Sequence, residues 1–159
     1  MALEIERKFL LANALWKMQV DHSVFYKQGY LSSQPTNSIR IRVCDDCAWL
    51  NIKSATIGVQ RHEFEYEIPL ADAHEILDQL CLKPVIEKTR HFVKMGPHHW
   101  EIDEFAGENL GLVVAEIELN AADEHFDKPD WLGLEVTHDV RYYNNNLARH
   151  PYSEWRDHV

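Results

Sequence analysis

Seven segments of the chain alternate charged and apolar side chains with a period of two residues. In 39–43, Arg40 and Arg42 alternate with three aliphatic residues, and in 113–119 Glu116 and Glu118 do the same. Successive side chains of a β-strand point to opposite faces. Each segment therefore predicts a strand with one ionic face and one apolar face.

The same alternation, with enrichment in β-branched and aromatic residues, predicts eight strands, at 3–10, 24–32, 37–44, 48–54, 60–69, 85–94, 99–105 and 112–120. Eight strands with few long connections between them are typical of an antiparallel barrel. Apolar residues at helical spacing predict a helix over 71–82. Two more helices are expected, over 139–149 and 152–157. The prediction is one α+β domain, residues 1–159, an eight-stranded antiparallel β-barrel with flanking helices.

Neighbouring residues on the charged faces mostly carry the same sign, so they repel unless opposite charges lie among them. One interpretation is a set of outward faces with salt bridges between strands. The other is a barrel with an ionic interior, whose apolar faces pack outward against helices. Repetition over seven strands favours the ionic interior. Carboxylates suit Mg²⁺ or Mn²⁺, and Arg and Lys suit phosphate oxygens.

The net charge of −10 argues against a protein that coats nucleic acid. A composition of 45% hydrophobic and 26% charged residues is typical of a globular protein. No apolar run is long enough for a spanning helix and no signal peptide is recognised, so no membrane association and a cytoplasmic location are expected.

Three cysteines are present, and Cys44 and Cys47 form a CxxC sequence where two strands are expected to turn. A hairpin turn flanked by two small apolar residues is favoured for this motif. No second ligand pair for zinc occurs in the sequence, which argues against a structural zinc site. A redox site or an adventitious metal site is the alternative.

An ordered series of motifs begins with Glu4-x-Glu6-x-Lys8 at the N-terminus. It continues with Gln28–Leu31, Arg40-x-Arg42, Lys53, Arg61-x-Glu63-x-Glu65, Glu87–Arg90, Asp103, Glu116-x-Glu118 and Glu135–Thr137. This series resembles the CYTH superfamily, the triphosphate tunnel metalloenzymes, over residues 3 to about 148. The family fold is an eight-stranded antiparallel barrel that forms a tunnel.

The resemblance implies roles for matching positions. Carboxylates would hold one or two Mg²⁺ or Mn²⁺ ions: Glu4, Glu6, Asp103, Glu116 and Glu118. A second group would bind the substrate: Lys8, Tyr30, Arg40, Arg42, Lys53, Arg61, Lys88 and Arg90. Lys88, Glu63 and Glu65 are the candidate catalytic residues. Family members often form homodimers, so a homodimer is one expected assembly.

The favoured function is a metal-dependent inorganic triphosphatase that cleaves the terminal phosphoryl group of tripolyphosphate, as the small bacterial members do. A class IV adenylate cyclase and a thiamine triphosphatase are alternatives on the same scaffold. A non-catalytic polyphosphate-binding module is an alternative of a different class, although anion binding alone would not need so many carboxylates.

Overall fold

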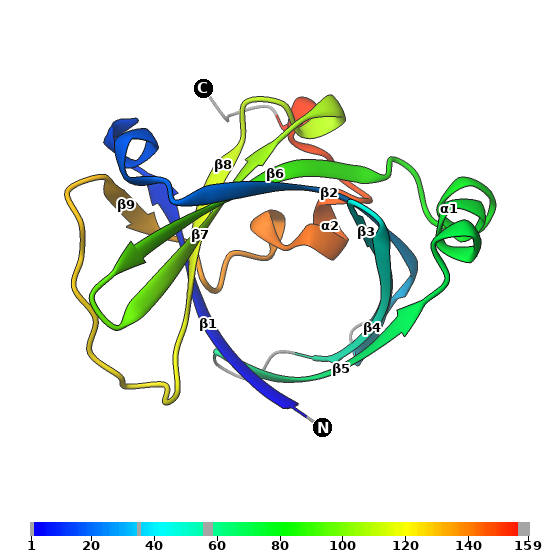
Figure 1. Ribbon diagram of the computed structural model, residues 1–159, viewed down its shortest axis with the longest axis horizontal. Helices are drawn as coiled ribbons and strands as arrows, with labels where there is room; N and C mark the ends of the chain where they lie inside the picture. The colour runs from blue at the N-terminus through cyan, green and yellow to red at the C-terminus, as the bar shows by residue number, and fades with distance from the viewer. Residues whose placement is uncertain (1, 35, 56–58, 156–159) are drawn as a thin grey trace.

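The computed structural model describes residues 2–34, 36–55 and 59–155. Figure 1 shows a ring of strands with short helical segments around it. The strands are β1 (Ala2–Leu11), β2 (His22–Ser33), β3 (Asn37–Cys44), β4 (Cys47–Ser54), β5 (Gln60–Ile68), β6 (Ile86–Met95), β7 (His98–Phe105), β8 (Val113–Glu118) and β9 (Leu132–Glu135). The helices are α1 (Leu70–Gln79) and α2 (Asn144–Leu147), and four 3₁₀ helices are η1 (Leu15–Gln19), η2 (Gly107–Asn109), η3 (Val140–Tyr142) and η4 (Tyr152–Glu154).

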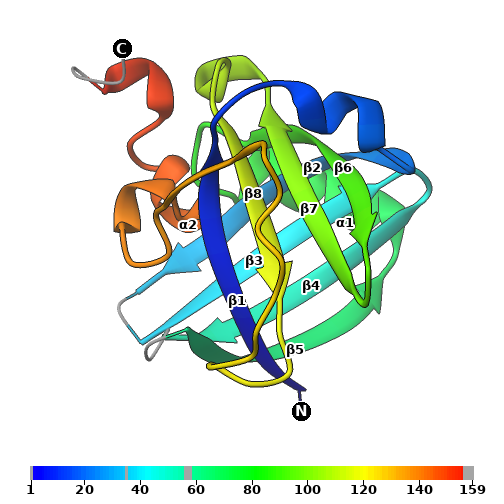
Figure 2. The same cartoon turned by 90° about the vertical axis from the view of Figure 1, so that its left-hand side faces the viewer.

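Strands β1 to β8 form a closed antiparallel barrel, as the sequence predicts. Neighbouring strands follow the order β5-β4-β3-β2-β6-β7-β8-β1, and β1 also pairs with β5. The N-terminal half of β1 makes this closure, with Glu4 opposite Arg61. Its C-terminal half pairs with β8, with Glu6 opposite Glu118. Figure 2 shows β1 crossing one wall of the barrel beside β8 and β7.

The predicted strands agree with the observed ones to within two residues at each end. The Cys44–Cys47 motif forms the β3–β4 hairpin, and both thiols are free. The short strand β9 was not expected from the sequence. It pairs with β1 at only two positions, and Gly133 lies so close to the Leu10 carbonyl that an added Cβ would come within 2.8 Å of its oxygen. So short a strand, with a glycine inside it, leaves no alternation to recognise.

Two predicted helices are corrected by the structure. The helix expected over 71–82 ends at Gln79. The helix expected over 139–149 is instead broken at Tyr143, whose backbone is extended between η3 and α2. The Asp139 side chain accepts a hydrogen bond from the Arg141 amide and caps η3, while three consecutive asparagines make α2 a weak helix. Of the helix expected over 152–157, residues 152–154 form η4, and 156–157 lie outside the described residues.

The strands contribute to three separate hydrophobic clusters, two on their outward faces and one on the inward face, where Tyr30, Ile86, Phe105 and Val114 lie beside the charged residues. One contains Trp100 and Trp131, one contains Phe105 and Trp155, and one packs Ile41 against helix α1. The two outward clusters leave much of the interior to the charged faces, and the inward cluster packs against Tyr142 and Leu147 of the C-terminal segment. None of the helices in residues 2–34, 36–55 and 59–155 is long and apolar enough to cross a membrane.

We predict that Gly29→Ala destabilises the fold, because α1 packs directly on the backbone of β2 at this residue. A Cβ at Gly29 would lie 2.9 Å from Cys81 Cβ and 3.0 Å from Leu77 Cδ2. Overpacking of this kind costs about 1–3 kcal/mol. Urea unfolding measures the change, with Ser32→Ala on the same strand as the control. An unchanged midpoint for Gly29→Ala would show that α1 moves away at no cost.

Candidate functional site

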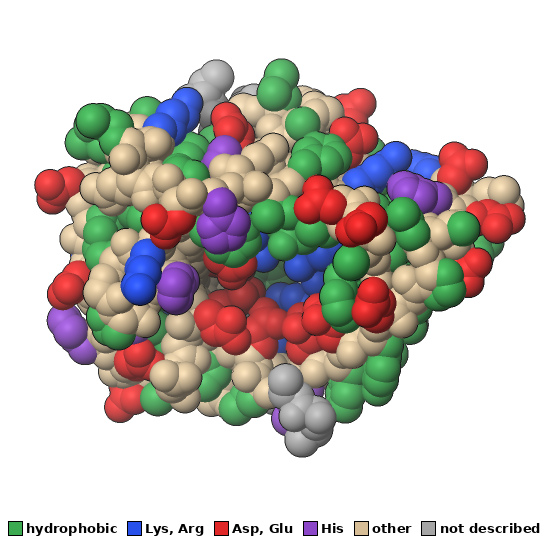
Figure 3. All heavy atoms as spheres, viewed as in Figure 1, with side chains coloured by type: hydrophobic (Ala, Val, Ile, Leu, Met, Phe, Trp, Pro, Cys, Tyr) green, Lys and Arg blue, Asp and Glu red, His purple; other side chains and the backbone are tan. Residues whose placement is uncertain are grey.

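The barrel encloses a charged tunnel of about 220 Å³. Figure 3 shows its mouth, with acidic side chains at the near edge and basic side chains deeper inside. Among the described residues that line it, seven are basic and six are glutamates: Lys8, Arg40, Arg42, Lys53, Arg61, Lys88, Arg90, Glu4, Glu6, Glu63, Glu101, Glu116 and Glu118. Seven of the chain's 16 lysines and arginines thus gather in one cavity, although the whole chain carries a net charge of −10. The ionic-interior interpretation is therefore correct.

Carboxylates gather on one wall because of the register between β1, β8 and β7. Glu6 lies opposite Glu118 across β1 and β8, and Glu101 lies opposite Glu116 across β7 and β8. Like charges at directly opposite positions repel each other. Burial raises the pKa of Glu6 well above its usual range, and the neighbouring carboxylates of Glu116 and Glu4 raise it further. This wall carries more negative charge than its own cations neutralise.

The donor chemistry of this wall fits a hard divalent cation. Glu6 lies within hydrogen-bonding reach of both Glu4 and Glu116, so three carboxylates share one small region. Oxygen ligands of this kind are those that Mg²⁺ and Mn²⁺ prefer. Within the described part of the chain, no three acidic, histidine or cysteine side chains already stand as a ready ligand set. The carboxylates are instead held by cations, such as Arg61 with Glu4 and Glu6.

The opposite wall carries two arginines that are bound by neutral amides. Arg40 Nε donates to Asn51 Oδ1 at 3.3 Å, and Arg42 Nε donates to Gln28 Oε1 at 2.9 Å. Within residues 2–34, 36–55 and 59–155, neither arginine has a carboxylate at ion-pair distance. Burial, together with the charge of Arg40, lowers the pKa of Arg42 to about 9. Positive charge is therefore uncompensated on this side of the tunnel.

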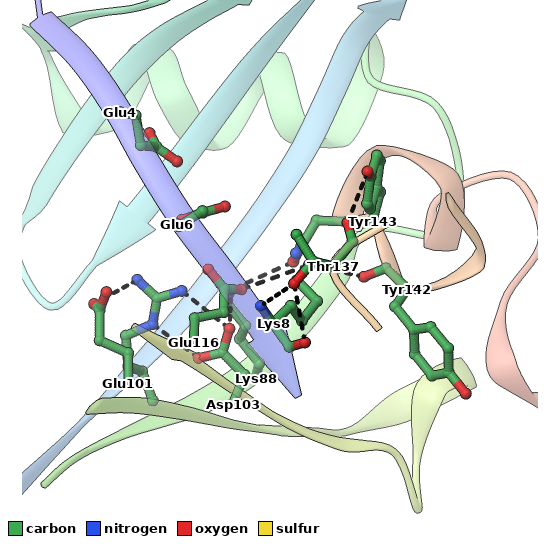
Figure 4. A network of polar contacts seen from close by, with 12 residues as sticks. Glu4, Glu6, Lys8, Lys88, Glu101, Asp103, Glu116, Thr137, Tyr142 and Tyr143 are labelled. Atoms are coloured by element: carbon green, nitrogen blue, oxygen red, sulfur yellow. Dashed lines mark hydrogen bonds and ion pairs between the residues drawn. The ribbon is translucent and has the colours of Figure 1, made fainter. Parts of the chain in front are cut away.

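Lys88 and Arg90 share one carboxylate, that of Asp103. Figure 4 shows Lys88 and Asp103 close to Glu101 and Glu116. Lys88 Nζ donates to Asp103 Oδ2 at 2.7 Å, and the Arg90 guanidinium donates to both Asp103 oxygens at 2.8 and 3.0 Å. Burial lowers the pKa of Lys88 to about 7, with a further contribution from Arg90. Burial alone would raise the pKa of Asp103, but Arg90 and Lys88 bring it down to about 2.

The remaining lysines are paired across strands. Lys53 Nζ lies 2.9 Å from Glu63 and 3.5 Å from Glu4, and Lys8 Nζ lies 3.6 Å from Glu116. Burial lowers the pKa of Lys53 to about 8, with Arg40 lowering it further. For Glu4, burial would raise the pKa, but Lys53 and Arg61 hold it well below the usual range.

The segment Val140–Leu147 lies across the bore of the tunnel when the barrel is viewed as in Figure 1. Lys8 Nζ donates to the Tyr142 carbonyl at 3.0 Å, and the Tyr143 hydroxyl donates to the Thr137 carbonyl at 2.9 Å. Asn144 Oδ1 accepts from Gln28 Nε2 and from Lys88 Nζ, at 3.0 and 3.3 Å. This segment thus contacts two lysines of the tunnel, Lys8 and Lys88.

Most of the residues predicted from the sequence line the tunnel, and two do not. Asp103 is fully buried behind Lys88 and Arg90, so its oxygens face cations and not the cavity. Glu65 is exposed and accepts a hydrogen bond from Asn51 Nδ2 at 2.7 Å, outside the set of lining residues. Tyr30 lines the tunnel as expected.

The alternation of charge in the sequence does not identify the neutral residues of the site. Tyr26 is one: its ring lies beneath two guanidinium groups, with Arg42 Cζ at 4.6 Å and Arg90 Cζ at 5.5 Å from its centroid. Its alternation with Gln28 and Tyr30 on β2 was the available signal. Four lining residues come from outside the barrel strands and show no such alternation, although the first belongs to the Glu135–Thr137 motif: Thr137, Tyr143, Asn144 and Asn145.

A model of the CYTH domain matches residues 2–152. The chain belongs to the CYTH family. A protein of Acetivibrio thermocellus named inorganic triphosphatase is 46% identical over 157 residues, covering 99% of this chain and all of that protein. A second inorganic triphosphatase, from Nitrosomonas europaea, is 37% identical over 91% of this chain and 96% of its own length. The crystal structure of the inorganic triphosphatase NE1496 matches this CYTH domain with a TM-score of 0.66 at 32% identity, covering 93% of this chain and 95% of that chain.

We predict that Asp103→Asn strongly destabilises this CYTH domain, because it leaves Lys88 and Arg90 buried without their shared counter-charge. Removing one partner of a buried ion pair costs about 3–5 kcal/mol. Urea unfolding measures the loss. The matched control is Glu101→Gln, since Glu101 is a more exposed partner of Arg90 at 2.9 Å, and removing it should cost about 1 kcal/mol or less. Equal losses for the two variants would contradict this account.

Proposed function

We propose that this chain is an inorganic triphosphatase, a metal-dependent hydrolase that converts tripolyphosphate and water to pyrophosphate and orthophosphate. The observation that carries the proposal is the pair Arg40, which is buried, and Arg42, which is partly buried, both lining the tunnel with neutral amide partners. Guanidinium groups without counter-ions in an enclosed cavity are suited to the oxygens of a phosphate chain. The names of the two curated relatives agree with this activity.

The basic side chains would bind the phosphate chain along the tunnel. Arg40 and Arg42 would contribute most, because no carboxylate competes for them among the described residues. Lys8, Lys53, Arg61, Lys88 and Arg90 would share their charge between the substrate and carboxylates already present. Phosphoryl transfer depends mainly on such positioning and charge neutralisation. Tyr30 would border the chain from the wall.

We propose Glu4, Glu6, Glu116 and Glu118 as the ligands of one or two Mg²⁺ or Mn²⁺ ions. When bound, such an ion neutralises phosphate oxygens and lowers the pKa of a bound water. The chain's own contribution is a wall of carboxylates whose mutual repulsion such a charge relieves. Asp103 is better suited to a positioning role, since Lys88 and Arg90 already occupy its oxygens.

Water would attack the terminal phosphorus in line with the bond to the bridging oxygen, which breaks as the new P–O bond forms. Glu63 lines the tunnel beside Lys53 and could orient that water, whereas the exposed Glu65 is less well placed. Lys88, with its pKa lowered to about 7 by burial and by Arg90, could protonate the bridging oxygen of the leaving pyrophosphate.

The rival activities need groups that this tunnel does not offer in its described part. A cyclase or a thiamine triphosphatase would need a surface for an aromatic ring, but the aromatic lining residues are Tyr30 and Tyr143, inside the charged cavity. A binding module would not need the crowded carboxylates of Glu4, Glu6 and Glu116. A cytoplasmic location and a homodimer stay predictions.

The decisive experiment offers tripolyphosphate, ATP and thiamine triphosphate in turn to the purified protein, with Mg²⁺, Mn²⁺ or EDTA. We expect orthophosphate release from tripolyphosphate that EDTA abolishes, and little from the other two. Cyclic AMP from ATP would identify a cyclase, and faster turnover of thiamine triphosphate would identify that enzyme. Tight binding of tripolyphosphate without turnover would identify a binding module.

We predict that Glu6→Gln lowers metal-dependent turnover at least about 100-fold, because one charged oxygen donor is lost from the proposed ligand set. Steady-state phosphate release across a Mg²⁺ and Mn²⁺ titration measures the effect. Glu67→Gln is the matched control, since Glu67 lies exposed on β5 outside the lining set. Full activity in Glu6→Gln would rule out its role as a ligand.

We predict that Arg42→Ala raises KM and lowers kcat together, because Arg42 would contact the phosphate chain in both the bound state and the transition state. The combined loss in kcat/KM should reach about 100-fold, the scale of a lost charge-assisted contact. Initial rates over a tripolyphosphate series give both constants. Unchanged kinetics with a lowered melting temperature would make Arg42 a structural residue only.

A further inference from the structure

Two carboxamides connect the basic wall to the C-terminal segment. Gln28, on β2, accepts from Arg42 Nε through Oε1 at 2.9 Å and donates through Nε2 to Asn144 Oδ1 at 3.0 Å. Asn144, on α2, also accepts from Lys88 Nζ at 3.3 Å. Arg42 and Lys88 are thus connected through two neutral side chains.

The series of hydrogen bonds from Arg42 through Gln28 and Asn144 to Lys88 has one direction, which is fixed by the cations at its two ends. Arginine and lysine can only donate, so the atoms that face them must be the amide oxygens. This leaves the Gln28 amino group to donate toward Asn144, whose oxygen accepts from both Gln28 and Lys88. The chain is therefore satisfied in one orientation of each amide, and rotating either amide would break it.

The neutrality of these partners matters for an anion site. A carboxylate in the place of Gln28 or Asn144 would hold Arg42 or Lys88 just as well, but would cancel the charge that a phosphate needs. Asp103 does this for Arg90, with bonds of 2.8 and 3.0 Å, and for Lys88, with a bond of 2.7 Å, so Arg42 is the cation whose charge the neutral partner preserves. A carboxamide holds the cation in a defined direction and leaves its charge available.

Burial makes the arrangement rigid. Gln28 is fully buried and Lys88 is 1% exposed, so an unmade hydrogen bond at either would not be replaced by water. Arg42 is fixed from another side by the ring of Tyr26, 4.6 Å from its Cζ atom. Gln28, Arg42 and Lys88 lie on strands of the barrel wall. Asn144 lies on α2, outside the wall strands.

We infer that Asn144 is a positioning residue for catalysis, which acts with Gln28 to hold Arg42 and Lys88 in the geometry that binds the phosphate chain. This inference rests on the proposed triphosphatase function. The inference gives the C-terminal segment a part in the active site, because Asn144 Oδ1 is the acceptor that Gln28 and Lys88 share.

The test compares Asn144→Ala, Gln28→Met and the double variant, with thermal unfolding measured for each. Methionine keeps the length of Gln28 and removes its polar atoms, so the buried site stays filled. The matched control is Asn146→Ala, on the same short helix. Asn146 Nδ2 donates to the Val140 carbonyl at 2.9 Å and holds the segment without contacting a cation of the tunnel.

We expect Asn144→Ala to lower kcat/KM for tripolyphosphate by about 10- to 100-fold, with kcat and KM both affected, as for the loss of a hydrogen bond to a charged group. Asn146→Ala should stay within about twofold of the wild type. Because Asn144 and Gln28 act through one bond, the double variant should lose much less than the product of the two single losses. Equal kinetics for Asn144→Ala and Asn146→Ala, or multiplicative losses in the double variant, would overturn the inference.

Binding separates this inference from the proposed function. Calorimetry with tripolyphosphate in EDTA measures the phosphate-binding cations alone, without turnover. If the wild type binds but does not hydrolyse, the triphosphatase assignment fails, and weaker binding by Asn144→Ala still supports the positioning role. If the wild type hydrolyses and Asn144→Ala binds and reacts normally, only the positioning role fails. If the wild type does not bind tripolyphosphate at all, both fail.

Discussion

The fold depends on burying ionised side chains inside a closed barrel. An isolated charge moved from water to an apolar interior costs many kcal/mol, and even a well-made buried pair recovers that cost only with good geometry. Lys88 and Asp103 are both almost completely buried, and the bonds that Asp103 makes to Lys88 and Arg90 are what make this tolerable. The strand register matters because it decides which charges meet. Glu4 opposite Arg61 and Lys53 opposite Glu63 are directly cross-strand pairs.

Two of the three hydrophobic clusters consequently lie outside the wall. Outward-facing strand residues supply the clusters around Trp100 and Ile41, which are covered by the connection between β8 and β9 and by α1, whereas inward-facing residues supply the cluster around Phe105, which is covered by the C-terminal segment. This partly inverts the usual arrangement of a small barrel, whose interior is filled by apolar side chains. The helices and loops are therefore needed for stability, since each cluster is completed by residues from outside the barrel strands, such as Trp131, Leu147 and Leu77. Gly29 shows how close this packing is, because α1 contacts the strand backbone there.

Much of this could be predicted from the sequence, because the alternation of charge reports on both faces of a strand at once. Arg40 and Arg42 share a face by their spacing, the repetition over seven strands favours the interior for that face, and both line the tunnel. The pattern predicts which face of a strand a side chain occupies, but not whether that side chain reaches the cavity. Asp103 and Glu65 both lie on the predicted face, yet Asp103 is buried behind two cations and Glu65 is exposed. Depth depends on strand tilt and on neighbouring side chains, which periodicity does not encode. The C-terminal segment was harder still, since its break at Tyr143 comes from the Asp139 cap and from contacts with Thr137, not from a repeating pattern.

The tunnel cations fall into two groups, those bound by carboxylates and those bound by amides. Lys53 and Arg90 have carboxylate partners, so the fold itself neutralises them. Arg40 and Arg42 have amide partners, so their charge remains while their direction is fixed. On the facing wall of β1, β7 and β8, the lining carboxylates outnumber the lining cations, and burial together with neighbouring carboxylates raises the pKa of Glu6 and Glu118, although Arg61 lies 3.3 Å from Glu6. A protein selected for stability alone would be expected to pair these groups with each other. Their separation into two walls leaves each with a charge that a ligand of opposite sign can complete, a cation on one side and an anion on the other. A triphosphate with its metal ion carries both, and one ligand can then relieve both excesses in a single binding event.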